Sequence, residues 1–79
     1  MPKFHLNIST RTTVILDEEG AELADLSSAR REAIMDARAL MSAAIMQGRD
    51  ISHRYIDICD ADGDLLLKVP FIEAYEPDD

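Results

Sequence analysis

The hydrophobic and polar positions of this chain follow two different periods. Apolar residues recur at helical spacing from Leu26 to about Gln47. On both sides of this segment they alternate at the two-residue spacing of strands. The segments that alternate in this way are residues 3–9, 12–16, 54–60 and 65–71. The order predicts an α+β domain of ββαββ type, with a four-stranded, mainly antiparallel sheet and one long helix packed on one face.

Local signals place the ends of the predicted helix. Asp25 is the expected N-cap, because its carboxylate can accept hydrogen bonds from the free backbone N–H groups of Ser27 or Ser28. Ser27 is the alternative cap. Gly48 is expected just after the last helical residue, where a positive φ commonly ends a helix.

Turn signals separate the predicted strands. Gly20 closes the acidic segment that begins at Asp17, and the pair Asp62-Gly63 predicts a type I′ hairpin turn between the last two strands. Pro70 cannot donate a ladder hydrogen bond, so the fourth strand is expected to end there or to lie on an edge of the sheet.

The two periods also predict which faces meet. The helix face expected to pack on the sheet carries Leu26, Ala29, Ala33, Ile34, Ala37, Leu40, Met41, Ala44 and Ile45. The sheet face expected to meet it carries Phe4, Leu6, Ile8, Val14, Leu16, Ile56, Ile58, Leu65, Leu67 and Val69.

The opposite helix face is less polar than a solvated face usually is. A narrow stripe there carries Met35, Ala39, Ser42 and Met46, with Arg31 and Arg38 on one flank and Glu32 and Asp36 on the other. Two methionines are compatible with an ordinary surface. They also suit an interface, because methionine adapts to the shape of a partner. Two such helices packed in parallel would bring each arginine flank onto an acidic flank, which predicts a twofold dimer or a partner helix at this stripe.

The outer face of the sheet is an alternative interaction surface. Strand alternation places polar and apolar side chains together there, among them His5, Tyr55, Asp57, Cys59 and Lys68. An ordinary solvated face explains most of this pattern. A small ligand held at a dimer seam by such groups is a further alternative.

Length and cysteine content bound the class of protein. The 79 residues predict one domain over residues 1–75 and a disordered acidic tail at 76–79. The only cysteine is Cys59, so no internal disulfide can form, which is typical of a reducing compartment. No apolar run has the length of a membrane span or a secretion signal. We therefore expect a cytoplasmic protein.

The charge limits the partners. Sixteen acidic and eight basic residues give a formal net charge of −8, which disfavours nucleic acid and anionic membranes. The sheet also lacks the paired aromatic residues on which RNA bases stack. A basic protein partner is compatible with this charge.

No motif predicts catalysis, a metal or a cofactor. The run from Asp60 to Asp64 lacks the spacing of a calcium loop, since Gly63 stands at position 4 and Phe71 at position 12. His5, His53 and Cys59 have no zinc-ligand spacing. The three glycines are isolated, so no phosphate loop exists. We expect no enzymatic activity.

Several segments together resemble a family of short bacterial proteins, of about 80 residues, that is classed only as a domain of unknown function. The matching segments are residues 2–6, 17–26, 29–30, 32–33, 48–50, 60–63 and 67–71. The chain departs from the family pattern at Ser9-Thr10-Arg11-Thr12, where an Asp- and Gly-rich turn is more usual. The resemblance implies a small α+β protein and carries over no catalytic residues.

A looser similarity, at the level of the fold, links the chain to antitoxin domains of bacterial toxin–antitoxin pairs. The sequence thus predicts a protein-interaction module, with a homodimer as the first expectation. The alternatives are an antitoxin-like or regulatory domain that binds a basic protein, or a domain that binds a small ligand at a dimer seam.

Overall fold

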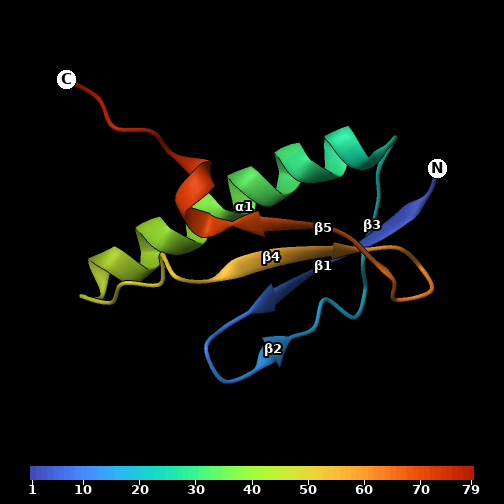
Figure 1. Ribbon diagram of the computed structural model, residues 1–79, viewed down its shortest axis with the longest axis horizontal. Helices are drawn as coiled ribbons and strands as arrows, with labels where there is room; N and C mark the ends of the chain where they lie inside the picture. Colours follow the sequence, from blue (N-terminus) through green and yellow to red (C-terminus); the bar gives the residue numbers. More distant parts are fainter.

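The computed structural model describes residues 1–79 as one helix packed on an antiparallel sheet (Figure 1). The elements are β1 (Lys3–Ser9), β2 (Val14–Ile15), β3 (Ala21–Glu22), α1 (Leu26–Met46), β4 (Tyr55–Cys59), β5 (Leu65–Pro70) and the 3₁₀-helix η1 (Phe71–Ala74). The strand order is β2-β1-β4-β5, and β3 also pairs with β1. The predicted α+β class and ββαββ order are confirmed. No helix combines the length and apolar character needed to cross a bilayer.

The helix begins and ends where the local signals place it. Asp25 is the N-cap, and its Oδ1 accepts a hydrogen bond from the Ser28 N–H at 2.8 Å. Gly48 follows the C-cap with a φ of +76°. The Arg49 N–H reaches back to the Ala44 carbonyl oxygen at 2.9 Å, which satisfies one of the last free carbonyls of the helix.

β2 and β3 both pair with β1 and together resemble one strand that is interrupted in its middle. β2 pairs Ile15 with Ile8, and β3 pairs Ala21 with Phe4, so the β2–β3 side has more residues than the β1 side opposite. Asp17 fills the interruption: its two carboxylate oxygens accept the N–H groups of Leu6 and Gly20, each at 3.1 Å. The carboxylate thus replaces a missing ladder bond.

This interruption corrects two predictions for the second strand. The strand covers only Val14–Ile15 instead of residues 12–16. Its faces are also reversed, because Ile15 lies opposite Ile8 on the helix side, whereas Val14 lies opposite Ser9 on the outer side. A slip of one residue exchanges the two faces of a strand, and alternation within a run of apolar residues cannot reveal it.

The second hairpin differs from prediction at its turn. Within this turn Gly63 has a positive φ, of +87°, but Asp62 does not, so the predicted type I′ turn is wrong. Asp60 organises the connection instead, since its Oδ1 accepts the N–H groups of Asp62 and Asp64, each at 3.0 Å. A register shift between Ile58 and Cys59 pairs Cys59 with Leu65. This pairing moves Leu65 away from the predicted inner face.

The core lies between the sheet and the helix, and η1 closes it. Its largest fully buried side chains are Phe71, Ile56, Ile58 and Val69. β5 lies on an edge of the sheet and ends at Pro70, as predicted for that proline. Phe71 does not continue the alternation of residues 65–70; it begins η1, which packs against α1.

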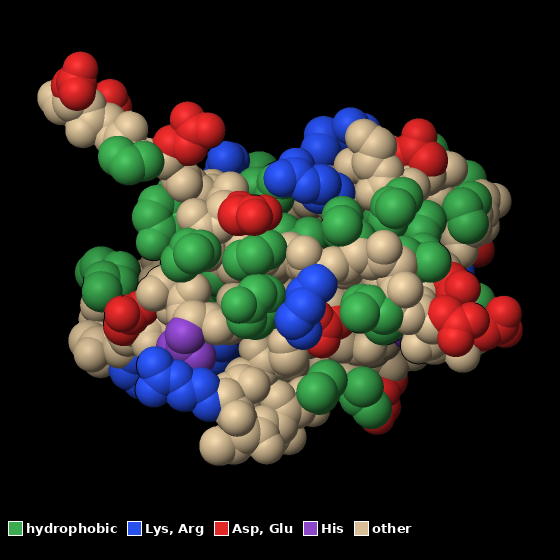
Figure 2. All heavy atoms as spheres, viewed as in Figure 1, with side chains coloured by type: hydrophobic (Ala, Val, Ile, Leu, Met, Phe, Trp, Pro, Cys, Tyr) green, Lys and Arg blue, Asp and Glu red, His purple; other side chains and the backbone are tan.

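The other face of the sheet has no covering layer. In the orientation of Figure 1 the sheet and η1 lie in front of α1, and Figure 2 shows this same side as spheres. Hydrophobic side chains form a band across its middle, with charged groups among and around them. Exposed apolar residues that contribute to this side include Val14, Tyr55 and Leu66.

Candidate interaction surface

The fully buried side chains of the helix are all small, while Ile34 and Met41 pack against the core in part and several other large side chains are exposed. Its four fully buried residues are Ala29, Ala33, Ala37 and Ala44. Met35, Ile45 and Met46 are 59%, 64% and 84% exposed. The expected burial of Leu26, Leu40 and Ile45 is therefore wrong. Alanine lets a helix lie close to a sheet, so the large side chains of β4, β5 and η1 fill the contact.

The predicted stripe of α1 is exposed along its whole length. We call this surface the helix stripe, and it consists of Arg31, Met35, Arg38, Ala39, Ser42 and Met46. Arg38 is anchored, because its Nε donates to the Ala74 carbonyl oxygen of η1 at 2.6 Å. Its Nη1 also lies 3.8 Å from the Met35 Sδ. Arg31 donates to two serine hydroxyls in the first turn of the helix. The arginine flank is therefore held in position.

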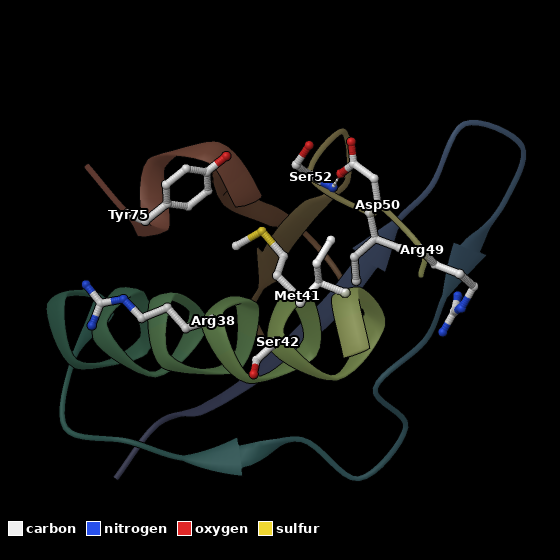
Figure 3. A pocket seen from close by; sticks show the side chains of 9 residues that line it. Arg38, Met41, Ser42, Arg49, Asp50, Ser52 and Tyr75 are labelled. Carbon is white, nitrogen blue, oxygen red and sulfur yellow. Dashed lines mark hydrogen bonds between the residues drawn. The ribbon is translucent and has the colours of Figure 1, made fainter. Parts of the chain in front are cut away.

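A cavity of about 480 Å³ adjoins the stripe beside the C-terminal half of α1. It is lined by Arg38, Met41, Ser42, Ile45, Arg49, Asp50, Ile51, Ser52 and Tyr75. Figure 3 shows Met41 rising from the helix toward the side from which Tyr75 comes, while the guanidinium groups of Arg38 and Arg49 point outward at opposite ends. The cavity therefore has an apolar centre and a polar rim, which suits an apolar side chain of a partner.

One wall of this cavity is formed by the residues just after the helix in the chain, and a local turn fixes it. The Asp50 Oδ1 accepts the Ser52 N–H at 2.9 Å, which is drawn in Figure 3. This backbone hydrogen bond lowers the pKa of Asp50. The turn places Ile51 in the core, at 6% exposure. Ile51 and Tyr75 lie outside every periodic segment, so hydrophobic patterning gave no signal for either.

The alternative surface on the sheet divides into separate groups. The Lys68 Nζ forms an ion pair with the Asp57 Oδ1 at 2.9 Å and lies 4.8 Å from the centroid of the Tyr55 ring. His5 belongs elsewhere, because its Nδ1 is 2.6 Å from the Asp17 carbonyl oxygen. No hollow of the structure contains both His5 and Tyr55. These groups do not converge on a single ligand position.

Cys59 lines the same hollow as His5, but its side chain is largely covered. It is 7% exposed, and its Sγ accepts a hydrogen bond from the Asn7 Nδ2 at 3.6 Å. Burial raises the pKa of the thiol, and the nearby Asp57 carboxylate raises it further. The thiolate is thus disfavoured at this buried position. No group of three or more His, Cys, Asp or Glu side chains is placed to hold a metal ion.

A second apolar surface lies on the other flank of α1. Two hollows of about 310 and 330 Å³ share Leu6, Ile8 and Asp36, and they separate the helix from the β2 edge of the sheet. We call them together the β1–β2 groove. Its apolar lining is Leu6, Ile8, Ile15, Leu16, Ala21, Ala39, Leu40 and Ile56, and its acidic residues are Asp17, Glu32 and Asp36.

Asp36 provides a pH test of this environment. Partial burial raises its pKa, and the charges of Glu32 and Asp17 raise it further. The folded state therefore binds this proton more tightly than the unfolded chain does, and stability falls as the pH rises through the pKa of the folded state. Asp36→Asn is expected to raise the free energy of unfolding at pH 7, with the gain disappearing below about pH 3.8. Urea unfolding across pH measures this.

Asp25→Asn is the matching comparison, because its expected effect on the stability at pH 7 has the opposite sign. The Ser28 N–H lowers the pKa of Asp25, so its charge stabilises the fold above the pKa of the unfolded state, and this contribution disappears as the pH falls. The variant is expected to lose stability at pH 7 and to match the parent protein in acid. A stability gain for Asp36→Asn that persists at low pH would contradict the assigned environment.

The comparisons with known proteins identify a family and leave its activity open. No curated protein matches the chain, and no solved structure matches it. The family described as Domain of unknown function (DUF6894) matches residues 3–72, which include every strand, the helix and the first half of η1. The chain belongs to the DUF6894 family.

Proposed function

We propose that this protein is a small protein–protein interaction module that forms a homodimer through the helix stripe and has no catalytic activity of its own. One observation carries the proposal: the fully buried residues of α1 are all alanines, and Met35 and Met46 of the helix stripe stand in solvent. A domain with 12 of its 79 residues buried has a thin core. Association would remove this apolar area from water.

The charges beside the stripe favour a second copy as the partner. Arg31 and Arg38 lie on one flank, and Glu32 and Asp36 on the other. In a parallel pair of helices related by a twofold axis, each arginine flank faces the acidic flank of the other copy. An antiparallel pair would place like charges together. The anchoring of Arg38 to η1 keeps one charged flank in place before association.

The methionines provide the test of this dimer. Met35→Lys with Met46→Lys is expected to convert a dimer into a monomer, because two charged groups would have to be buried at the contact. Sedimentation equilibrium measures the mass, and circular dichroism verifies that the helix remains. Both side chains are exposed in the single copy, so the fold is expected to persist.

A matched variant controls for charge. Glu76→Gln with Asp78→Asn also makes the net charge less negative by two, but it changes only the C-terminal segment after η1. This variant is expected to keep the mass of the parent protein. A monomeric parent protein, or a doubly substituted helix with unchanged mass, would reject a dimer through the helix stripe.

The proposal includes a reducing compartment, such as the cytoplasm, as the place where the protein acts. The single cysteine supports it, since Cys59 is a free thiol packed in the core and no disulfide contributes to the fold.

A further inference from the structure

The sheet is wider than the helix that covers it. α1 packs against β4, β5 and η1, while β2 lies on the far side of the sheet from β5 (Figure 1). Neighbouring strands lie about 4.8 Å apart and a helix with its side chains is about 10 Å wide, so one helix covers roughly two strands. The uncovered part, over β1 and β2, is about as wide as a second helix.

The floor of this uncovered part is apolar. Leu6 and Ile8 of β1 line both hollows of the β1–β2 groove, and Ile15 of β2 lies opposite Ile8. On the helix side the wall includes Leu40, which is 39% exposed although its position on α1 faces the sheet. These side chains stand at positions that a covering helix would bury.

The rim of the groove is acidic, and its carboxylates form no ion pair within the chain. Glu32, Asp36 and Asp17 line it, and neither hollow is lined by a lysine or an arginine. The ion pair between Lys68 and Asp57, on the other face of the sheet, involves none of them. Partial burial raises the pKa of Asp36, which a basic partner would offset. The missing counter-charges must come from outside this chain.

We propose that the β1–β2 groove binds an amphipathic helix with lysine or arginine flanks, supplied by a partner protein. The apolar stripe of that helix packs on Leu6, Ile8, Ile15 and Leu40, and its basic flank meets Asp36 and Glu32. A second copy of this chain fits the groove less well, since its net charge is −8 and its exposed helix face carries acids on one flank. This contact shares Glu32, Asp36 and Ala39 with the dimer contact at the helix stripe, so the partner helix and a second copy would compete for the acidic flank.

The test uses a defined probe on the full chain. The probe is a fluorescently labelled 14-residue peptide of leucine and lysine, with leucines at helical spacing, and its comparator has glutamate at every lysine position. Fluorescence anisotropy is expected to show binding of the lysine peptide alone, weakened by added salt. Methyl NMR shifts are expected at Ile8, Ile15 and Leu40. The monomeric variant of the helix stripe is expected to bind at least as tightly, because no second copy then faces Glu32 and Asp36, and this separates the groove contact from the dimer.

Charge-matched variants locate the binding. Glu32→Lys with Asp36→Lys is expected to weaken binding at least about tenfold, because repulsion replaces attraction at the rim. Glu76→Lys with Asp78→Lys makes the same charge change in the tail and is expected to weaken binding by less than about threefold. Should the groove variant fold poorly, Glu32→Gln with Asp36→Asn tests the same contact through a smaller loss of affinity.

Three results would overturn the proposal. The first is equal loss of binding in the groove and tail variants, which would indicate attraction to the net charge alone. The second is a set of NMR shifts confined to other surfaces. The third is binding of the lysine peptide by the parent protein but not by the monomeric variant of the helix stripe, which would place the contact at the dimer seam.

Discussion

Phe71→Ala is expected to lower the free energy of unfolding by about 3–5 kcal/mol, the usual cost of removing a fully buried aromatic ring. Phe71 has 0% exposure and is among the largest fully buried side chains of the chain. A domain of this size has a total stability of about 4–12 kcal/mol. The variant is therefore expected to lose at least about a quarter of the stability of the parent protein. Urea unfolding followed by circular dichroism measures the loss.

The position of Phe71 explains the size of this effect. It is the first residue of η1, and its N–H donates to the Arg54 carbonyl oxygen at 2.9 Å, so the ring enters the core directly after β5 ends. The other aromatic core residue, Phe4, lies on β1. Losing the ring leaves a cavity beneath η1 that the short surrounding elements cannot easily close.

The adjacent isoleucine is the matched control. Ile72 lies in the same turn of η1 but is 57% exposed. Ile72→Ala is expected to change the free energy of unfolding by less than about 0.5 kcal/mol. Comparable losses for the two variants would show that η1 does not close the core as the structure indicates.

Gly20→Ala is expected to be the second most destabilising change, at about 2–5 kcal/mol, from two causes that add. Gly20 has a φ of +69°, a conformation that costs other residues about 1–2 kcal/mol. A Cβ at this position would also lie 2.9 Å from the Phe4 carbonyl oxygen, which is backbone and cannot rotate away. Overpacking of this kind adds about 1–3 kcal/mol. Urea unfolding measures the sum.

Gly63→Ala measures the cost of the backbone conformation without the steric cost. Gly63 has a φ of +87°, and a Cβ there would meet nothing within 4 Å. Its substitution is expected to cost only the conformational part, about 1–2 kcal/mol. If the two variants lost equal stability, the close approach of Gly20 to β1 would not matter, and the role of the Asp17–Gly20 segment in joining β2 to β3 would need another explanation.

The candidate surfaces were predictable to different degrees. Helical spacing alone places Met35 and Met46 opposite the buried alanines, and both are exposed in the structure. The same spacing places Ile45 on the buried side, but it is 64% exposed and lines the cavity beside the C-terminal half of α1. The β1–β2 groove could not be predicted, since it depends on where the helix lies across the sheet. That position results from η1 and the alanine contact together.

The amino-acid sequence by itself determined the α+β class, the element order and both ends of the helix, because periodicity and capping are local properties that act within a few residues. The tertiary structure decided the register of β2, the burial of Cys59 and Phe71, and the part of the sheet left open. These features depend on contacts between residues far apart in the chain, such as the bonds from Asp17 to β1 and from Arg38 to η1. A pattern read along one segment carries no information about which distant segment will cover it.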